Sequence, residues 1–168
     1  ACGAGGTPVS FIMKIQNCSF VEALRYLAQK YNIPVPEREM TEEEQQRKNE
    51  REALYLANEV AAKFFTEQLL SSEEGLDIAL PYFTQRGVRS EAIQAFGLGY
   101  SPSDRRALAK YVEEHGYDME SFVATGLLYA PSEGRPSGDR YHERVIFPIY
   151  NVGGRVVGFG GRTMRKAD

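Results

Sequence analysis

The stretch Asp139–Arg162, DRYHERVIFPIYNVGGRVVGFGGR, decides the fold of this 168-residue chain. Its pattern predicts two strands, Arg144–Tyr150 and Arg155–Phe159, joined by a tight turn. The first strand is almost wholly apolar and rich in Val and Ile, which is typical of a strand covered on both faces. In the turn, Gly153 and Gly154 can adopt the positive φ that a short hairpin needs. The sequence therefore predicts a C-terminal β-hairpin.

The residues before this hairpin carry mainly helical signals. The segments Ser19–Glu22 and Thr41–Glu44 are capping boxes, in which a hydroxyl and a carboxylate satisfy the free N–H groups at a helix start. They predict helices over residues 20–31 and 42–70. The second of these has a polar first half and an apolar stripe in its second half, so we expect the core to begin near Leu54.

A third helix is predicted to open at Ser71–Glu74, to be bent or interrupted near Pro81, and to end at a left-handed Gly87. Short helices are then expected over 90–96, 103–115 and 118–125, and a short strand over 127–130. Because helices come first and strands last, the predicted fold class is α+β: a helix-rich N-terminal part followed by a small sheet with the C-terminal β-hairpin.

The charge is unevenly distributed along the chain. The net charge of −3 argues against a wholly basic nucleic-acid binder. Residues 135–166, however, hold seven bases against Asp139 and Glu143, a local balance of +5 that is typical of a surface facing a polyanion. Scattered solvated charge is the alternative. No run approaches the roughly 18 apolar residues of a membrane span, and the N-terminus lacks signal-peptide features, so we expect a cytoplasmic protein with no membrane partner.

Several possible sites are weak when judged on their residues alone. The glycines of Gly158–Gly161 lack the spacing of a dinucleotide-binding loop, and we expect them to let the backbone bend sharply at a strand end. No nucleophile pattern accompanies His115 or His142. Asp139 is expected to form an ion pair with a neighbouring arginine, and the acids do not converge as magnesium ligands would.

The two cysteines do not indicate a disulfide framework. Cys2, in CGAGG, could be part of a zinc knuckle, but one thiolate cannot make a tetrahedral site. Cys18 is expected to be a small, buried side chain. We therefore predict that residues 1–33 do not hold a zinc-ribbon fold by themselves.

Three segments resemble bacterial DNA primases, which synthesise RNA primers on single-stranded DNA. The opening, CGAGG…FIM…SFVEALRYLAQKYNIPV, resembles the end of that family's zinc-ribbon domain and its trailing helix. Residues 82–102, YFTQRGVRSEAIQAFGLGYSP, resemble the start of the N-terminal subdomain of the catalytic core, and residues 139–162 resemble its end. The resemblance implies three parts: a zinc-ribbon tail (1–33), a linker with the exposed start of a long helix (34–52), and the core's N-terminal subdomain (53–168).

For function, the resemblance implies a DNA-directed RNA polymerase of DNA replication, a nucleotidyltransferase. Its expected partners are a single-stranded DNA template, ribonucleoside triphosphates, and a replicative helicase that binds a C-terminal domain absent here. The implied cofactors of the full-length protein are zinc, with Cys2 as one ligand, and magnesium, held by the acids of a toprim subdomain that follows the GFGGR segment. The chain alone is therefore expected to hold neither metal and to be inactive.

The same resemblance assigns the template- and nucleotide-binding residues. Arg86 of the QRG element and Arg162 of GFGGR match basic positions at the family's active-site cleft, and Arg140 and Arg144 lie in the matching DRYHER string. Arginine suits this task because its planar guanidinium contacts phosphates in a bidentate manner. A surface salt bridge is the alternative for each. For the whole chain, the alternatives are a non-catalytic single-stranded DNA-binding module of another replication or repair protein, and a nucleotide-binding enzyme that uses the GFGG turn.

Overall fold

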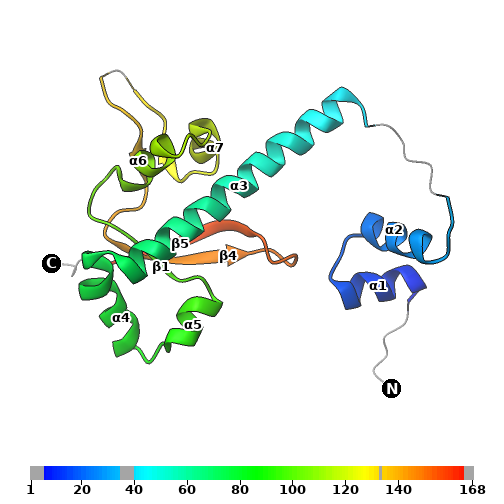
Figure 1. The fold of residues 1–168 in the computed structure, drawn as a ribbon, viewed down its shortest axis with the longest axis horizontal. Coiled ribbons are helices and arrows are strands. Elements are labelled where there is room, and N and C mark those ends of the chain that lie inside the picture. Colours follow the sequence, from blue (N-terminus) through cyan, green and yellow to red (C-terminus); the bar gives the residue numbers. More distant parts are fainter. Residues whose placement is uncertain (1–5, 35–39, 133, 165–168) are drawn as a thin grey trace. The chain divides into compact units, whose positions relative to one another are not determined.

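The computed structural model describes residues 6–34, 40–132 and 134–164 (Figure 1). The chain forms two compact units. The first consists of residues 1–46 with 152–154, and the second of residues 47–151 with 155–168. The fold class is α+β as predicted, with most helices before the strands and the hairpin of β4 (Arg144–Tyr150) and β5 (Val156–Thr163) last. The boundaries predicted at residues 33 and 52 stay predictions.

The first unit contains the helices α1 (Pro8–Gln16) and α2 (Phe20–Lys30). The capping box at Ser19 is confirmed, because its hydroxyl accepts from the Glu22 N–H and the Glu22 carboxylate accepts from the Ser19 N–H. Helix α1 was not predicted, although Thr7 caps it and Pro8 occupies its first turn. Among the described residues of this unit, only the alanines 23 and 28 are buried.

Helix α3 (Glu42–Ser71) is the longest element, and its predicted extent is confirmed. Thr41 and Glu44 form the expected capping box. Its apolar stripe enters the core at Ala57, one turn later than expected, because Leu54 is 37% exposed.

The main sheet has three antiparallel strands in the order β1-β4-β5. Strand β1 spans Gly99–Ser101, β4 spans Arg144–Tyr150 and β5 spans Val156–Thr163. The hairpin is confirmed (orange and red in Figure 1), but β5 continues through the glycines to Thr163. The predicted bend at Gly158–Gly161 is therefore wrong. A second sheet pairs β2 (Leu128–Tyr129) with β3 (Gly138–Asp139).

Strand β4 is covered on both faces only in its first part. Val145 and Ile146 are buried, whereas Phe147 and Ile149 are 38% and 52% exposed. Strand β1 pairs with β4 only as far as Ile146. Pro148 lies beyond that point, where a missing backbone donor costs no ladder hydrogen bond.

Five further helical segments surround the sheet. The predicted interruption near Pro81 is confirmed, because a π-helical turn ends at Ala79 and Pro81 lies in the first turn of a new helix. Gly87 ends that helix with φ 73°, as predicted. The segments are η1 (Gly75–Ala79), α4 (Leu80–Gln85), α5 (Ser90–Ala95), α6 (Ala107–Glu114) and α7 (Met119–Ala124).

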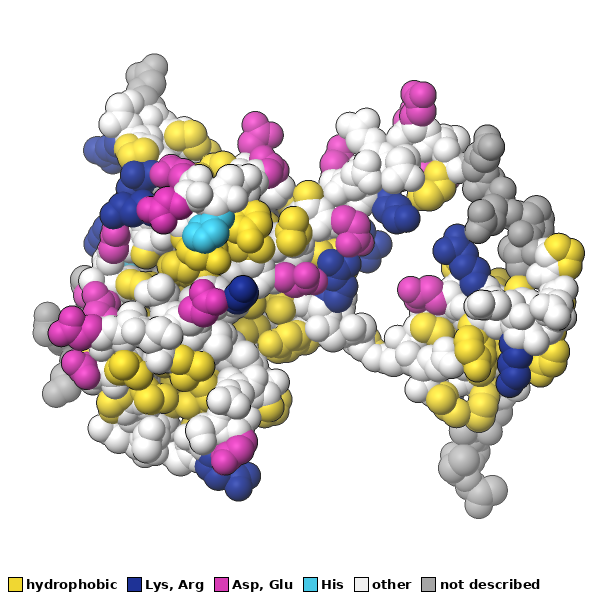
Figure 2. Space-filling view, in the orientation of Figure 1, with side chains coloured by type: hydrophobic (Ala, Val, Ile, Leu, Met, Phe, Trp, Pro, Cys, Tyr) yellow, Lys and Arg dark blue, Asp and Glu magenta, His cyan; other side chains and the backbone are white. Residues whose placement is uncertain are grey.

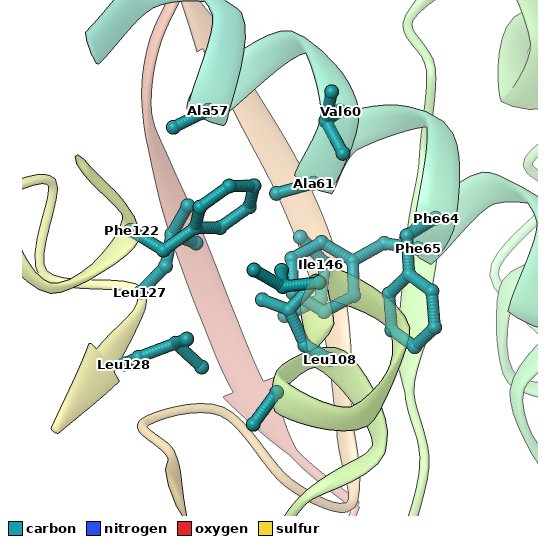
Figure 3. Packing of buried hydrophobic residues seen from close by; sticks show 12 residues of the cluster. Ala57, Val60, Ala61, Phe64, Phe65, Leu108, Phe122, Leu127, Leu128 and Ile146 are labelled. Atoms are coloured by element: carbon teal, nitrogen blue, oxygen red, sulfur yellow. The ribbon is translucent and has the colours of Figure 1, made fainter. Parts of the chain in front are cut away.

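Two hydrophobic clusters lie on opposite faces of the sheet. In the first, Phe64 and Phe65 of α3 pack with Ile146 of β4 and with side chains of α6 and α7 (Figure 3). In the second, Val145 packs with Phe83 of α4 and with residues of β1 and α5. Neighbouring residues of a strand point to opposite faces, so Val145 and Ile146 belong to different clusters. The β4–β5 hairpin is thereby held between α3 and α4.

Candidate nucleic-acid interface

Arg162 lies near the end of β5, directly opposite Val145 of β4. Directly opposed residues of an antiparallel pair share one face of the sheet, so Arg162 lies on the face of the second cluster. The side chain is exposed, and among the described residues its guanidinium has no hydrogen-bond or ion-pair partner. This guanidinium can therefore accept an external anion without losing an internal contact.

Arg86 follows the last residue of α4 and folds back onto the helix. Its Nη1 donates to the Tyr82 carbonyl at 3.3 Å, and its guanidinium carbon lies 3.7 Å from the centre of the Tyr82 ring. Stacking on an aromatic face fixes the guanidinium plane while leaving donors at its edge. Tyr82 packs against the second cluster, so Arg86 belongs to the same side of the sheet as Arg162.

The other two predicted arginines lie elsewhere. Arg140 is exposed and stacks on Tyr129 of β2, with 4.7 Å between its guanidinium carbon and the ring centre. Arg144 is half-buried, and its Nη1 donates to the Gly161 carbonyl at 3.2 Å. The structure thus brings Arg86 and Arg162 to one face and separates Arg140 and Arg144 from them.

Tyr141 holds the glycine segment in place, a role that sequence reasoning missed. Its hydroxyl donates to the Phe159 carbonyl at 2.8 Å. A Cβ at Gly161 would lie 2.6 Å from a carbon of the Tyr141 ring, so this glycine is needed for the ring to pack. Together with Arg144, Tyr141 sets the course of β5 that leads to Arg162.

Some arginines of the hairpin region have acidic partners. Arg155 pairs with Glu52 at 2.8 Å and with Glu59 at 3.1 Å, and it stacks on Tyr55 at 3.9 Å. Outside the hairpin region, Arg106, directly before α6, pairs with Glu113 at 2.7 Å. Figure 2 shows the same mixture on its visible face, where Lys and Arg side chains lie among Asp and Glu. Counts of charged residues along the sequence therefore overstate how much basic surface is free to bind a polyanion.

Asp139 does not form the predicted ion pair. Its carboxylate is buried and accepts the N–H groups of Leu108 at 2.8 Å and Ala109 at 3.0 Å, so it caps α6 from β3. Burial raises the pKa of the Asp139 carboxyl to about 6, although these two hydrogen bonds act in the opposite direction. The carboxylate has a structural task at the start of α6.

The raised pKa of Asp139 predicts how stability changes with pH. The folded protein binds this proton near pH 6 and the unfolded chain only near pH 4, so the carboxyl adds stability as the pH falls between these values. From pH 7 to pH 5 the gain is on the order of 1 kcal/mol. Urea unfolding of the wild type and of Asp139→Asn at both values should show a gain that the variant lacks. Equal changes in both proteins would contradict the assignment.

Two family models match the chain. Residues 64–168 match the N-terminal domain of the DNA primase catalytic core, and residues 1–43 match the CHC2 zinc finger. The first match covers more than half of the chain, and the arginine-bearing hairpin lies within it. The chain therefore belongs to the DNA primase family.

Relatives and solved structures agree with this assignment. The DNA primase of Clostridium acetobutylicum is 36% identical over 163 residues, covering 97% of this chain and 26% of that protein. The RNA polymerase domain of Mycobacterium tuberculosis primase, solved with double-stranded DNA, has a TM-score of 0.63 at 36% identity, covering 70% of this chain and 36% of that one. A primase catalytic domain bound to single-stranded DNA has a TM-score of 0.61 at 30% identity, covering 71% and 37%. The chain spans about a quarter of the length of the curated relatives it matches.

The zinc prediction is supported for the family but not for individual residues of this chain. The zinc-finger match supports zinc for the family, but Cys2 lies outside the described residues, and its role as a ligand stays a prediction. Cys18 is half-buried, with its thiol 3.9 Å from the Ile12 carbonyl. In the part of the chain that the structure describes, no three His, Cys, Asp or Glu side chains gather as metal ligands would, and no helix is long and apolar enough to cross a membrane.

Proposed function

We propose that this chain supplies a phosphate-binding surface in the catalytic core of a DNA primase that makes RNA primers on single-stranded DNA. The observation that carries the proposal is the pair Arg86 and Arg162, which share one side of the β4–β5 hairpin and have no acidic partner among the described residues. The likeness to a primase catalytic domain bound to single-stranded DNA supports it.

The two arginines differ in what they can do. Arg86 is held by its stack on Tyr82, so its donors are oriented before an anion arrives. Arg162 extends from a strand braced by Tyr141 and Arg144. Phosphates of a template strand and of a ribonucleoside triphosphate both suit such groups, because charge-assisted hydrogen bonds from guanidinium are strong and geometrically specific. Arg140, stacked on Tyr129, is proposed as a more distant contact to the same polyanion.

In this proposal the chain does not perform the reaction alone. Nucleotidyl transfer is assigned to magnesium held by the acids of a toprim subdomain outside these 168 residues, and zinc to a site that includes Cys2. A replicative helicase is the proposed partner of a further domain. The residues of this chain bind and orient phosphate groups, and no metal-dependent step is assigned to them.

Salt dependence tests the proposal on the 168-residue chain. Binding of a fluorescein-labelled oligothymidylate, followed by fluorescence anisotropy, should weaken as salt rises, because each phosphate contact releases counterions. Two contacts predict a slope of about −1.4 for log affinity against log salt, at roughly −0.7 per phosphate of a single strand. Binding that does not change with salt would contradict the assignment of these arginines to phosphates.

A further inference from the structure

The sheet face that carries Arg162 also carries a partly exposed apolar surface. In the β4–β5 register, Phe147 lies opposite Gly160 and Ile149 lies opposite Gly158. Opposed residues and residues two apart along a strand share a face, so all four lie on the face of Arg162. We call this set, Phe147, Ile149, Gly158, Gly160 and Arg162, the glycine shelf.

The backbone does not require glycine at two of these positions. Gly158 and Gly160 have no positive φ, so other residues could adopt their conformation. A Cβ at Gly158 would meet nothing within 4 Å, and one at Gly160 would meet only Phe147 atoms at ordinary contact distance. Gly161 differs, because a Cβ there would collide with Tyr141. Packing therefore explains Gly161, whereas the other two glycines leave a flat area uncovered.

The apolar side chains beside these glycines are partly exposed. Phe147 is 38% exposed, and Phe83 of α4 meets its ring edge to face at 5.8 Å between centroids. Ile149 is 52% exposed. Phe83 comes from the same helix as Tyr82, on which Arg86 stacks. A flat apolar surface thus lies beside cationic groups.

We propose that the glycine shelf receives unpaired bases of a single nucleic-acid strand while Arg162 binds an adjoining phosphate. A nucleotide has a flat base and a charged phosphate beside it. The base matches the apolar residues of the shelf, and the phosphate matches Arg162. Stacking on an aromatic side chain tolerates any base, since every base has a π-face. Bases within a duplex have their faces covered by neighbouring pairs, so the shelf favours single strands. The inference rests on the proposed phosphate-binding function and adds base contact to it.

The test separates bases from phosphates by using two strands of equal length, an oligothymidylate and an abasic strand with the same backbone. The wild-type chain should bind the oligothymidylate roughly tenfold more tightly. In the double variant Gly158→Ala and Gly160→Ala, the added methyl groups lift the bases from the sheet. The preference should then fall toward one, with affinity for the abasic strand unchanged.

The control is Val157→Ala, on the opposite face of the same strand, which should keep the preference. Thermal melting checks folding, and the double variant should melt no lower than the wild type because its methyl groups enter open space. Equal binding of both strands by the wild type, or an undiminished preference in the double variant, would overturn the inference and leave phosphate binding intact. Failure to bind either strand would overturn both.

Discussion

Gly75→Ala should destabilise the unit that contains residues 47–151 by about 3 kcal/mol or more, at the upper end of overpacking effects. A Cβ at Gly75 would collide with the Gln68 carbonyl oxygen and would lie 2.7 Å from that of Leu69. Both obstacles are backbone atoms at the end of α3, so no side-chain rotation can relieve the contact. The chain would have to separate α3 from η1, and with it the second hydrophobic cluster.

The same displacement would affect a hydrogen-bond network. Glu74, next to Gly75, accepts from the Tyr100 hydroxyl at 3.0 Å, and from the backbone N–H and the hydroxyl of Ser103 at 2.8 Å and 2.6 Å. These bonds connect η1 to β1 and the residues after it. Displacing Glu74 would leave the buried Tyr100 hydroxyl without its acceptor, which is costly in the interior.

Chemical denaturation measures this prediction. The urea midpoint of Gly75→Ala should fall well below that of the wild type. Gly158→Ala is the matched control, because it adds the same methyl group in open space and should leave the midpoint nearly unchanged. If both variants unfolded at the wild-type midpoint, the close approach of η1 to α3 would be wrong.

Features that depend on neighbouring residues were predicted well from the sequence. The capping boxes at Ser19 and Thr41, the left-handed Gly87 and the interruption at Pro81 all arise from contacts within one or two helical turns. The hairpin was also predicted, because its turn and its apolar strand are adjacent in the chain. Helix α1 could have been found as well, from Thr7 followed by Pro8.

Features that depend on distant residues were missed. Helix α6 begins at Ala107 instead of Ser103, and its cap comes from Asp139, far along the chain. Strands β1 and β3 have only three and two residues, too few for a periodic pattern. The glycines near Gly161 suggested a bend, but the reason for Gly161 is the Tyr141 ring, which a local pattern does not reveal.

In the candidate site, too, the sequence predicted the local features and missed the contacts between distant residues. Motif resemblance identified the four arginines, yet it could not tell which have partners. Their contacts depend on the folded structure. Arg86 stacks on Tyr82, Arg140 stacks on Tyr129, and Arg144 donates to the β5 backbone. Only the register of β4 with β5 places the exposed Arg162 on the face of the second cluster.

Arg162→Ala should weaken binding of single-stranded DNA roughly tenfold or more, the loss expected for a charge-assisted hydrogen bond. The melting temperature should stay near that of the wild type, because the guanidinium has no partner among the described residues. In an active primase that contains this chain, primer yield should fall with the same substitution.

Arg155→Ala is the matched control. Arg155 lies on the same hairpin, but its guanidinium is engaged by Glu52, Glu59 and Tyr55. Its removal should lower the melting temperature and leave DNA affinity nearly unchanged. The two variants remove the same charge from the same hairpin, so net charge cannot explain a difference between them.

The most direct measurement is therefore the affinity of the wild type, Arg162→Ala and Arg155→Ala for one labelled oligothymidylate at low salt, with a melting curve for each protein. The account predicts that Arg162→Ala loses affinity and keeps its melting temperature, while Arg155→Ala shows the reverse. Equal losses of affinity in both variants, or none in Arg162→Ala, would contradict the claim that this face of the hairpin binds nucleic acid.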